Sequence, residues 1–194
     1  LAYVKKFQFK TLTSDDFVQF YMDFFKGKLK EDVEIDWRAW FDGTGMPPVE
    51  NKFDETLCKD VAAVVRCWSE DRGRGAKSTD IENWHTLQVL LLLDSLQQLQ
   101  KDENAGINSE LLGRLGEMYK FGESGNAEIL FRWATVCLRA DMKSAVPLAA
   151  KLLSTQGRMK FTRPLFRDLF ASSVGKATAV KVFKEQKESY HPIC

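Results

Sequence analysis

The sequence contains few histidines, and none of them stands at a metal-binding spacing. His85 and His191 are the only two. Neither belongs to an HExxH motif, in which two histidines four residues apart share one helix face and hold a zinc ion. The acidic set "SDD" at 14–16 lies where a helix is expected to begin, and the helix macrodipole favours carboxylates there. We therefore expect no catalytic residue and no metal ligand within this chain.

Cysteine pairs at redox or zinc-binding spacing are also missing. The four cysteines, Cys58, Cys67, Cys137 and Cys194, form no CxxC motif. The first three lie in apolar helical patterns, which are typical of reduced thiols in a protein core. The opening segment "LAYVKKFQFK" has no sustained apolar core of the kind found in secretory signals, so we expect a cytoplasmic protein. It also lacks an initiator methionine, and we expect the chain to be part of a longer protein.

Long apolar runs and an excess of either charge are absent as well. The most apolar run, "LQVLLLLDSL" at 87–96, is interrupted by polar residues and is shorter than the roughly 20 residues that span a bilayer. The 28 Lys and Arg residues almost balance the 27 Asp and Glu residues, so no global field attracts nucleic acid or anionic lipid. We therefore expect neither nucleic acid nor a membrane as a partner.

Apolar residues recur at helical spacing along most of the chain, whereas alternating β-branched runs bounded by hairpin turns are missing. Phe17, Phe20 and Phe24 form one such helical stripe, with Thr13 or Ser14 as the N-cap. The pattern predicts helices over 13–26, 36–42, 54–69, 78–100, 109–119, 126–139, 142–154, 164–172 and 176–190. The predicted fold class is therefore all-α.

Short connections between these helices indicate antiparallel hairpins, stacked as in an α-solenoid. The helix over 78–100 has the widest apolar face, which predicts a central position. Its predicted buried residues are Leu87, Leu90, Leu91, Leu93 and Leu96. We expect a single helical domain over 1–194, with 1–12 as an incoming linker.

The stretch "TQGRMKFTRPLF" at 155–166 concentrates positive charge between two predicted helices. Gly157 is a suitable residue to end the first helix, and Pro164 fits the first turn of the second. If residues 158–162 form an extended connector, Arg158 and Lys160 point to the same side. Met159 and Phe161 then point to the opposite side and are expected to anchor the segment to the core. Such a pair of cations could bind a carboxylate as an anion receptor. The alternative is a basic surface loop that neutralises the carbonyl groups at a helix C-terminus or pairs with acidic side chains elsewhere.

Four segments together resemble a known family. "QGRMKFTRPLF", "GMPPVENKFDETL", "AEILFRWATVCL" and the closing "HP" are similar to the C-terminal helical domain of the family of leukotriene A4 hydrolase, aminopeptidase B and aminopeptidase O. The resemblance runs from about Phe9 to His191. It implies a zinc aminopeptidase whose zinc ligands lie in a separate catalytic domain that precedes this region.

The resemblance also implies roles for this chain. The helical domain is expected to pack on the catalytic domain and to wall the substrate cleft, while Arg158 and Lys160 hold the C-terminal carboxylate of a short peptide. By itself, the chain is expected to bind no cofactor and to be inactive. The residues also leave open a stand-alone helical-repeat module whose cations bind an acidic peptide.

Overall fold

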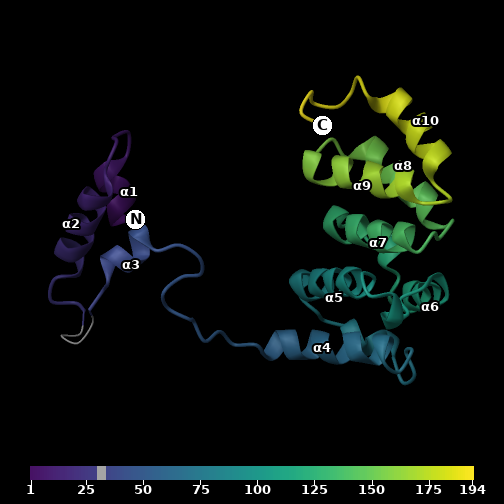
Figure 1. Ribbon diagram of the computed structural model, residues 1–194, viewed down its shortest axis with the longest axis horizontal. Helices are drawn as coiled ribbons and strands as arrows, with labels where there is room; N and C mark the ends of the chain where they lie inside the picture. The colour runs from purple at the N-terminus through teal and green to yellow at the C-terminus, as the bar shows by residue number, and fades with distance from the viewer. Residues whose placement is uncertain (30–33) are drawn as a thin grey trace. The chain divides into compact units, whose positions relative to one another are not determined.

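The computed structural model describes residues 1–29 and 34–194, and every regular element in these residues is a helix (Figure 1). The all-α fold class is thus confirmed. No helix among the described residues combines the length and the apolar character needed to cross a membrane. The contacts divide the chain into two compact units, Leu1–Phe53 and Asp54–Cys194. A single domain over 1–194 stays a prediction.

The first unit contains α1 (Ala2–Phe7), α2 (Ser14–Phe25) and α3 (Trp37–Asp42). Helix α1 lies inside the stretch 1–12 that was expected to be a linker. The predicted N-cap of α2 is confirmed, because the Thr13 hydroxyl accepts the amide hydrogen of Asp16 at 3.2 Å. Asp36 likewise caps α3 by accepting the amide hydrogen of Ala39 at 2.9 Å.

Aromatic side chains hold the first unit together. Trp37 of α3 meets two rings of α2 edge to face, with ring centroids 6.1 Å from Phe17 and 5.2 Å from Tyr21. Such contacts add to the hydrophobic gain of burying the rings. None of the residues in α1, α2 or α3 is fully buried, however. The unit therefore has a network of rings rather than an enclosed core.

The second unit is a stack of helices, and Figure 1 shows them succeeding one another from α4 to α10. Contacts link α4 with α5, α5 with α7, α7 with α8 and α9, and α10 with α8 and α9. This succession confirms the predicted solenoid-like arrangement. The helices are α4 (Thr56–Ser69), α5 (Thr86–Leu99), α6 (Ser109–Tyr119), α7 (Ala127–Arg139), α8 (Ala145–Thr155), α9 (Met159–Ala171) and α10 (Lys176–Gln186).

Three of these helices show where sequence patterns succeed and where they fail. Helix α6 has the predicted bounds, and α7 begins one residue later than predicted. Helix α5 begins only at Thr86, because residues 78–81 form a separate 3₁₀ turn. Its buried face is also shifted, since Leu87 and Leu91 are exposed, so their predicted burial was wrong.

Gln88 takes a place on the buried face of α5 because its amide is satisfied there. Its Nε2 donates to the carbonyl of Leu57 at 3.3 Å, and its Oε1 accepts the amide hydrogen of His85 at 3.0 Å. A buried amide with both ends paired carries little desolvation cost. The buried apolar residues of the second unit form one core cluster. Its fully buried members include Trp68, Leu92, Leu93, Leu96, Leu112, Leu115, Leu138, Leu165 and Leu169.

The three cysteines that were expected in the core differ in their surroundings. Cys137 is buried, and burial raises the pKa of its thiol to about 12. Cys67 is partly buried, whereas Cys58 is exposed. The prediction for Cys58 was wrong because α4 buries the stripe of Val61, Val64 and Trp68, and Cys58 lies outside it.

Candidate functional site

The basic stretch that was expected to be an extended connector forms the beginning of a helix. Gln156 and Arg158 have extended backbone, and α9 begins at Met159. Lys160 therefore lies in the first helical turn. The prediction of an extended segment over 158–162 was therefore wrong. The reason is that Phe161 belongs to a buried stripe along the helix, together with two later leucines.

That stripe consists of Phe161, Leu165 and Leu169, which repeat every four residues and are all buried. A helix from Met159 lets all three reach the core together. Met159 itself is 40% exposed, so the expectation that it anchors the segment beside Phe161 was also wrong. Pro164 stands at the sixth helical position instead of the first turn; its missing N–H removes one intrahelical hydrogen bond.

Arg158 is the N-cap residue of α9, and this is an unusual choice. N-cap side chains are usually acceptors that bond the first amide hydrogens of a helix, whereas a guanidinium has donors only. Arg158 accordingly makes no side-chain cap hydrogen bond. The first turn of α9 thus presents amide donors, the positive end of the helix dipole and two cationic side chains together, which is a setting that favours an anion.

Glu128 of α7 connects these two cations to the rest of the fold. Its carboxylate accepts a hydrogen bond from the Lys160 ammonium, and its Oε1 lies 3.9 Å from Nη1 of Arg158. The other oxygen, Oε2, accepts from Nη1 of Arg132 at 2.7 Å. Arg132 in turn donates through Nε to Asp94 of α5 at 2.7 Å. Charged groups from three helices therefore form one cluster.

The ring of Phe161 lies beneath both cations. The guanidinium carbon of Arg158 is 5.7 Å from the ring centroid, and Nζ of Lys160 is 5.4 Å from it. Phe161 is itself held by Phe131, with the ring centroids 5.3 Å apart. The negative face of an aromatic ring attracts cations. A buried ring thus helps to keep the two exposed cations next to each other.

The charge balance of this cluster leaves a net positive charge. Arg132, Arg158 and Lys160 supply three positive charges, and Asp94 and Glu128 supply two negative ones. The hydrogen bond from Lys160, followed by that from Arg132, lowers the pKa of Glu128 below its ordinary value. Glu128 is therefore ionised at neutral pH.

Exposure differs sharply within the cluster. The side chain of Arg158 is 67% exposed and that of Lys160 is 45% exposed, against 17% for Arg132. An incoming anion would meet Arg158 and Lys160 first. Both cations contact Glu128, as the alternative of a basic surface that pairs with acidic side chains predicts. The carboxylate-binding role of Arg158 and Lys160 stays a prediction.

The two histidines take part in local structure. His85 is exposed at the N-cap of α5, and Nδ1 of His191 accepts the amide hydrogen of Ile193 at 3.2 Å. Within residues 1–29 and 34–194, no group of three or more His, Cys, Asp and Glu side chains could hold a metal ion. These residues therefore do not fit a zinc ion.

Sequence reasoning missed the acidic and basic residues behind the two cations. Glu128 and Arg132 are spaced i, i+4 on α7, a spacing that indicates an ion pair. That signal was available in the sequence. Glu128 and Lys160 are 32 residues apart in the sequence, so no local sequence pattern predicts their contact.

Comparison with known proteins places the chain in a family context. The family model described as "Leukotriene A4 hydrolase, C-terminal" matches residues 84–194. This match includes the charged cluster and the whole of α5 to α10.

Individual relatives match over almost the entire chain. Leukotriene A-4 hydrolase of Xenopus laevis is 31% identical over 192 residues, which are 99% of this chain and 31% of the relative. Leucine aminopeptidase 2 of Aspergillus oryzae is 33% identical over 197 residues, again 99% of this chain and 31% of the relative. The structure of native leukotriene A4 hydrolase from Saccharomyces cerevisiae superposes with a TM-score of 0.79 at 29% identity, covering 100% of this chain and 33% of that one. The chain thus spans about a third of the length of these proteins.

Proposed function

The chain belongs to the leukotriene A4 hydrolase family, whose C-terminal domain it matches, and from this premise we propose that it is the C-terminal part of a zinc-dependent aminopeptidase. In this proposal the helical stack packs on the catalytic domain of the same polypeptide and forms one wall of the substrate cleft. Relatives named leucine aminopeptidase 2 support a peptide substrate.

The role proposed for Arg158 and Lys160 is to bind the C-terminal carboxylate of a short peptide. The observation that carries this role is the arrangement at the start of α9, where a donor-only N-cap residue and a neighbouring lysine present their charges to solvent. Guanidinium can bind a carboxylate through two parallel hydrogen bonds, and the ammonium adds a second charge.

The proposed zinc ion belongs to the catalytic domain. The described residues offer no cluster that fits a metal ion, and the proposal assigns the zinc ligands to the catalytic domain. The 194 residues alone should show no peptidase activity. A cytoplasmic location is part of the same proposal, and the four free thiols suit a reducing compartment.

What the chain contributes to hydrolysis is position. Holding the far end of a short peptide fixes the distance between its carboxylate and its scissile bond, and this reduces the entropy lost on reaching the transition state. Arg158 and Lys160 therefore select peptides that have a free carboxylate and a suitable length. They act at the end of the substrate opposite to the amino group.

Kinetics of the complete polypeptide test this proposal. Arg158→Ala should lower kcat/KM for tripeptides with a free carboxylate by a factor equivalent to about 2–4 kcal/mol, the usual cost of breaking a hydrogen-bonded charge pair. C-terminally amidated tripeptides should lose little. Lys151→Ala, an exposed position on α8, is the matched control and should change neither. An equal loss on both substrates would show that Arg158 does not bind the carboxylate.

A further inference from the structure

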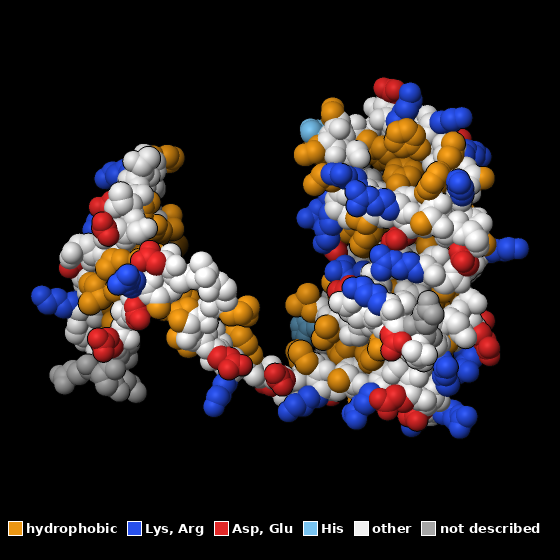
Figure 2. All heavy atoms as spheres, in the orientation of Figure 1, with side chains coloured by type: hydrophobic (Ala, Val, Ile, Leu, Met, Phe, Trp, Pro, Cys, Tyr) orange, Lys and Arg blue, Asp and Glu red, His pale blue; other side chains and the backbone are white. Residues whose placement is uncertain are grey.

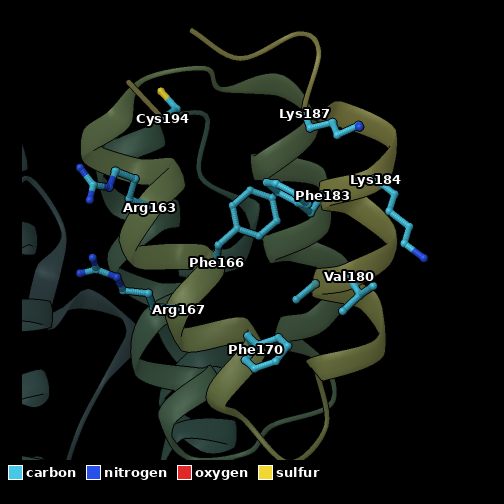
Figure 3. A pocket seen from close by; sticks show the side chains of 10 residues that line it. Arg163, Phe166, Arg167, Phe170, Val180, Phe183, Lys184, Lys187 and Cys194 are labelled. Carbon is cyan, nitrogen blue, oxygen red and sulfur yellow. The ribbon is translucent and has the colours of Figure 1, made fainter. Parts of the chain in front are cut away.

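An open groove separates α9 from α10 at a second surface of the helical stack, and Figure 3 shows its side chains. Its volume is about 610 Å³. Helix α9 contributes Arg163, Phe166, Arg167 and Phe170, and α10 contributes Ala179, Val180, Phe183 and Lys184. Lys187, the C-cap residue of α10, and Cys194 complete the lining. None of these residues belongs to the cluster around Arg158.

The floor of the groove is apolar and accessible. Phe170 is 48% exposed, Val180 is 41% exposed and Phe183 is 52% exposed. Phe166 and Phe183 meet edge to face across the groove, with ring centroids 5.9 Å apart. Several large apolar side chains exposed together usually mark an interaction site.

Cations flank this apolar floor on two sides. In Figure 3, Arg163 and Arg167 of α9 extend to one side, and Lys184 of α10 and its C-cap residue Lys187 extend to the other. Figure 2 shows hydrophobic side chains surrounded by Lys and Arg over these helices. Nζ of Lys187 lies 3.4 Å from Oε1 of Glu188, so these two side chains form a salt bridge. Arg167 and Lys184 form no salt bridge with any described residue. Two rim charges are thus available to a partner.

The spacing of the lining residues has a helical period on both sides. Residues 163, 166, 167 and 170 of α9 follow i, i+3, i+4 and i+7. Residues 180, 183 and 184 of α10 and its C-cap residue 187 have the same spacing. A groove between two helices with this spacing accepts a third helix by the same ridge-and-groove packing that joins helices in a core. No helix among the described residues covers this groove.

We propose that the groove between α9 and α10 binds an amphipathic helix whose apolar stripe is flanked by carboxylates on both sides. The apolar stripe would lie on Phe166, Phe170 and Phe183. The carboxylates would meet Arg167 on one rim and Lys184 on the other. This binding site is separate from the carboxylate site of the proposed function and does not depend on it.

The distribution of charge favours this occupant over two others. A single-chain anionic amphiphile has one headgroup, so it would use cations at one end of the groove rather than along both rims. An anionic membrane is flat and fits an exposed convex helix face better than a groove. An acidic amphipathic helix can place its apolar stripe on the concave floor and its carboxylates next to the cations on both rims.

Binding of a designed peptide tests the proposal. The probe is a fluorescein-labelled peptide of about 18 residues, with leucines at i, i+3, i+4 and i+7 and glutamates on both flanks. Fluorescence anisotropy with the complete polypeptide should show saturable binding, and a peptide with glutamine for every glutamate should bind at least about tenfold more weakly. Raising the salt from about 0.05 M to about 0.5 M should weaken binding of the glutamate peptide.

Variants of the chain assign the binding to the groove. Arg167→Glu combined with Lys184→Glu should weaken binding of the glutamate peptide by at least about tenfold. Lys181→Glu, on α10 but outside the groove lining, should change it less than about twofold. Circular dichroism checks that each variant keeps its helix content, and Arg167→Gln with Lys184→Gln is a milder second pair with the same expected direction.

Three results would overturn the proposal. One is equal binding of the glutamate and glutamine peptides. Another is that both double variants bind the glutamate peptide with the same affinity as the wild type. The third is a preference of the groove for phosphatidylserine vesicles or dodecanoate, with no saturable binding of the glutamate peptide.

Discussion

Glu128 accepts a hydrogen bond from the Lys160 ammonium, and this contact joins α7 to the first turn of α9. The same oxygen lies 3.9 Å from the guanidinium of Arg158. Glu128 therefore does two things at the proposed carboxylate site. It orients the two cations, and its negative charge competes with any anion that approaches them.

Removing that charge should strengthen binding of a substrate carboxylate. In the complete polypeptide we expect Glu128→Gln to lower KM for tripeptides with a free carboxylate by about three- to tenfold. A unit charge about 4 Å away in a partly solvated site interacts by roughly 1–4 kcal/mol, and exposure of Arg158 reduces this toward the lower end. Steady-state kinetics measures the change.

Amidated tripeptides serve as the internal control for this effect, and their KM should stay constant. Glu117→Gln, an exposed position on α6, is the matched variant and should leave KM for both substrates unchanged. An increase in KM for the free-carboxylate peptides would mean that orientation of Lys160 by Glu128 outweighs the competition.

Glu128 should also make stability depend on acid pH. Its native pKa is lowered, first by the hydrogen bond from Lys160 and then by that from Arg132. Its stabilising contribution is therefore present above the ordinary glutamate pKa of about 4.3 and is lost as the pH falls below it. Urea unfolding from pH 7 to pH 3 should show wild type more stable than Glu128→Gln at neutral pH, with the difference shrinking below about pH 4.5. A constant difference across this range would contradict an ionised Glu128 in the native cluster.

Much of the helical architecture could be predicted from local signals. Asn108 accepts the amide hydrogen of Leu111 at 3.0 Å, and α6 has the bounds that its pattern predicts. The start of α9 could not be predicted in the same way, because Pro164 indicates a first turn there. Burial of Phe161 outweighs that local preference and extends the helix back to Met159.

The candidate site was only partly predictable for a related reason. Arg158 and Lys160 stand in a conspicuous basic stretch and in segments that resemble the family. Their partner Glu128 belongs to another helix, and only the packing of α7 against α9 brings it near. Sequence spacing predicts which residues are neighbours on one helix, whereas this site is formed by residues of two helices.

A pair of glycines on α6 tests how tightly the core is packed. A Cβ atom on Gly116 would lie 2.6 Å from Cζ2 of Trp133, while one on Gly113 would meet no atom within 4 Å. Trp133 is buried and has little room to move. Gly116→Ala should therefore lower the free energy of unfolding by about 1–3 kcal/mol through overpacking.

Gly113→Ala is the matched control on the same helix. Alanine is the better helix former, so this variant should raise the free energy of unfolding by about 0.5–1 kcal/mol. Urea titration followed by circular dichroism measures both values. Similar stabilisation by the two alanines would show that α6 and Trp133 do not pack as closely as described.

Tyr119 connects two parts of the core through its hydroxyl group. Nε1 of Trp68 donates to the Tyr119 oxygen at 3.1 Å, and the hydroxyl donates to Oδ2 of Asp80 at 3.2 Å. Tyr119→Phe leaves the buried indole N–H without its acceptor. We expect this variant to lose about 1–3 kcal/mol of unfolding free energy at pH 7.

Alkaline pH should remove the extra unfolding free energy that the wild type has over Tyr119→Phe. Burial, with a further contribution from Asp80, raises the pKa of Tyr119 to about 12, whereas an unfolded tyrosine titrates near pH 10. The contribution of neutral Tyr119 is therefore complete below about pH 10 and is lost as the pH rises toward 12.

The difference in unfolding free energy between wild type and Tyr119→Phe should accordingly narrow as the pH rises above about 10. Cys137, whose thiol pKa is also raised to about 12 by burial, lowers the stability of both proteins over the same range. Its effect is common to both proteins and cancels in the comparison. The narrowing therefore reports Tyr119 together with its interaction with Cys67, which also raises the Tyr119 pKa. A difference that stays constant up to pH 12 would mean that the hydroxyl titrates as in the unfolded chain, and the Trp68–Tyr119–Asp80 hydrogen bonds would then not hold it neutral.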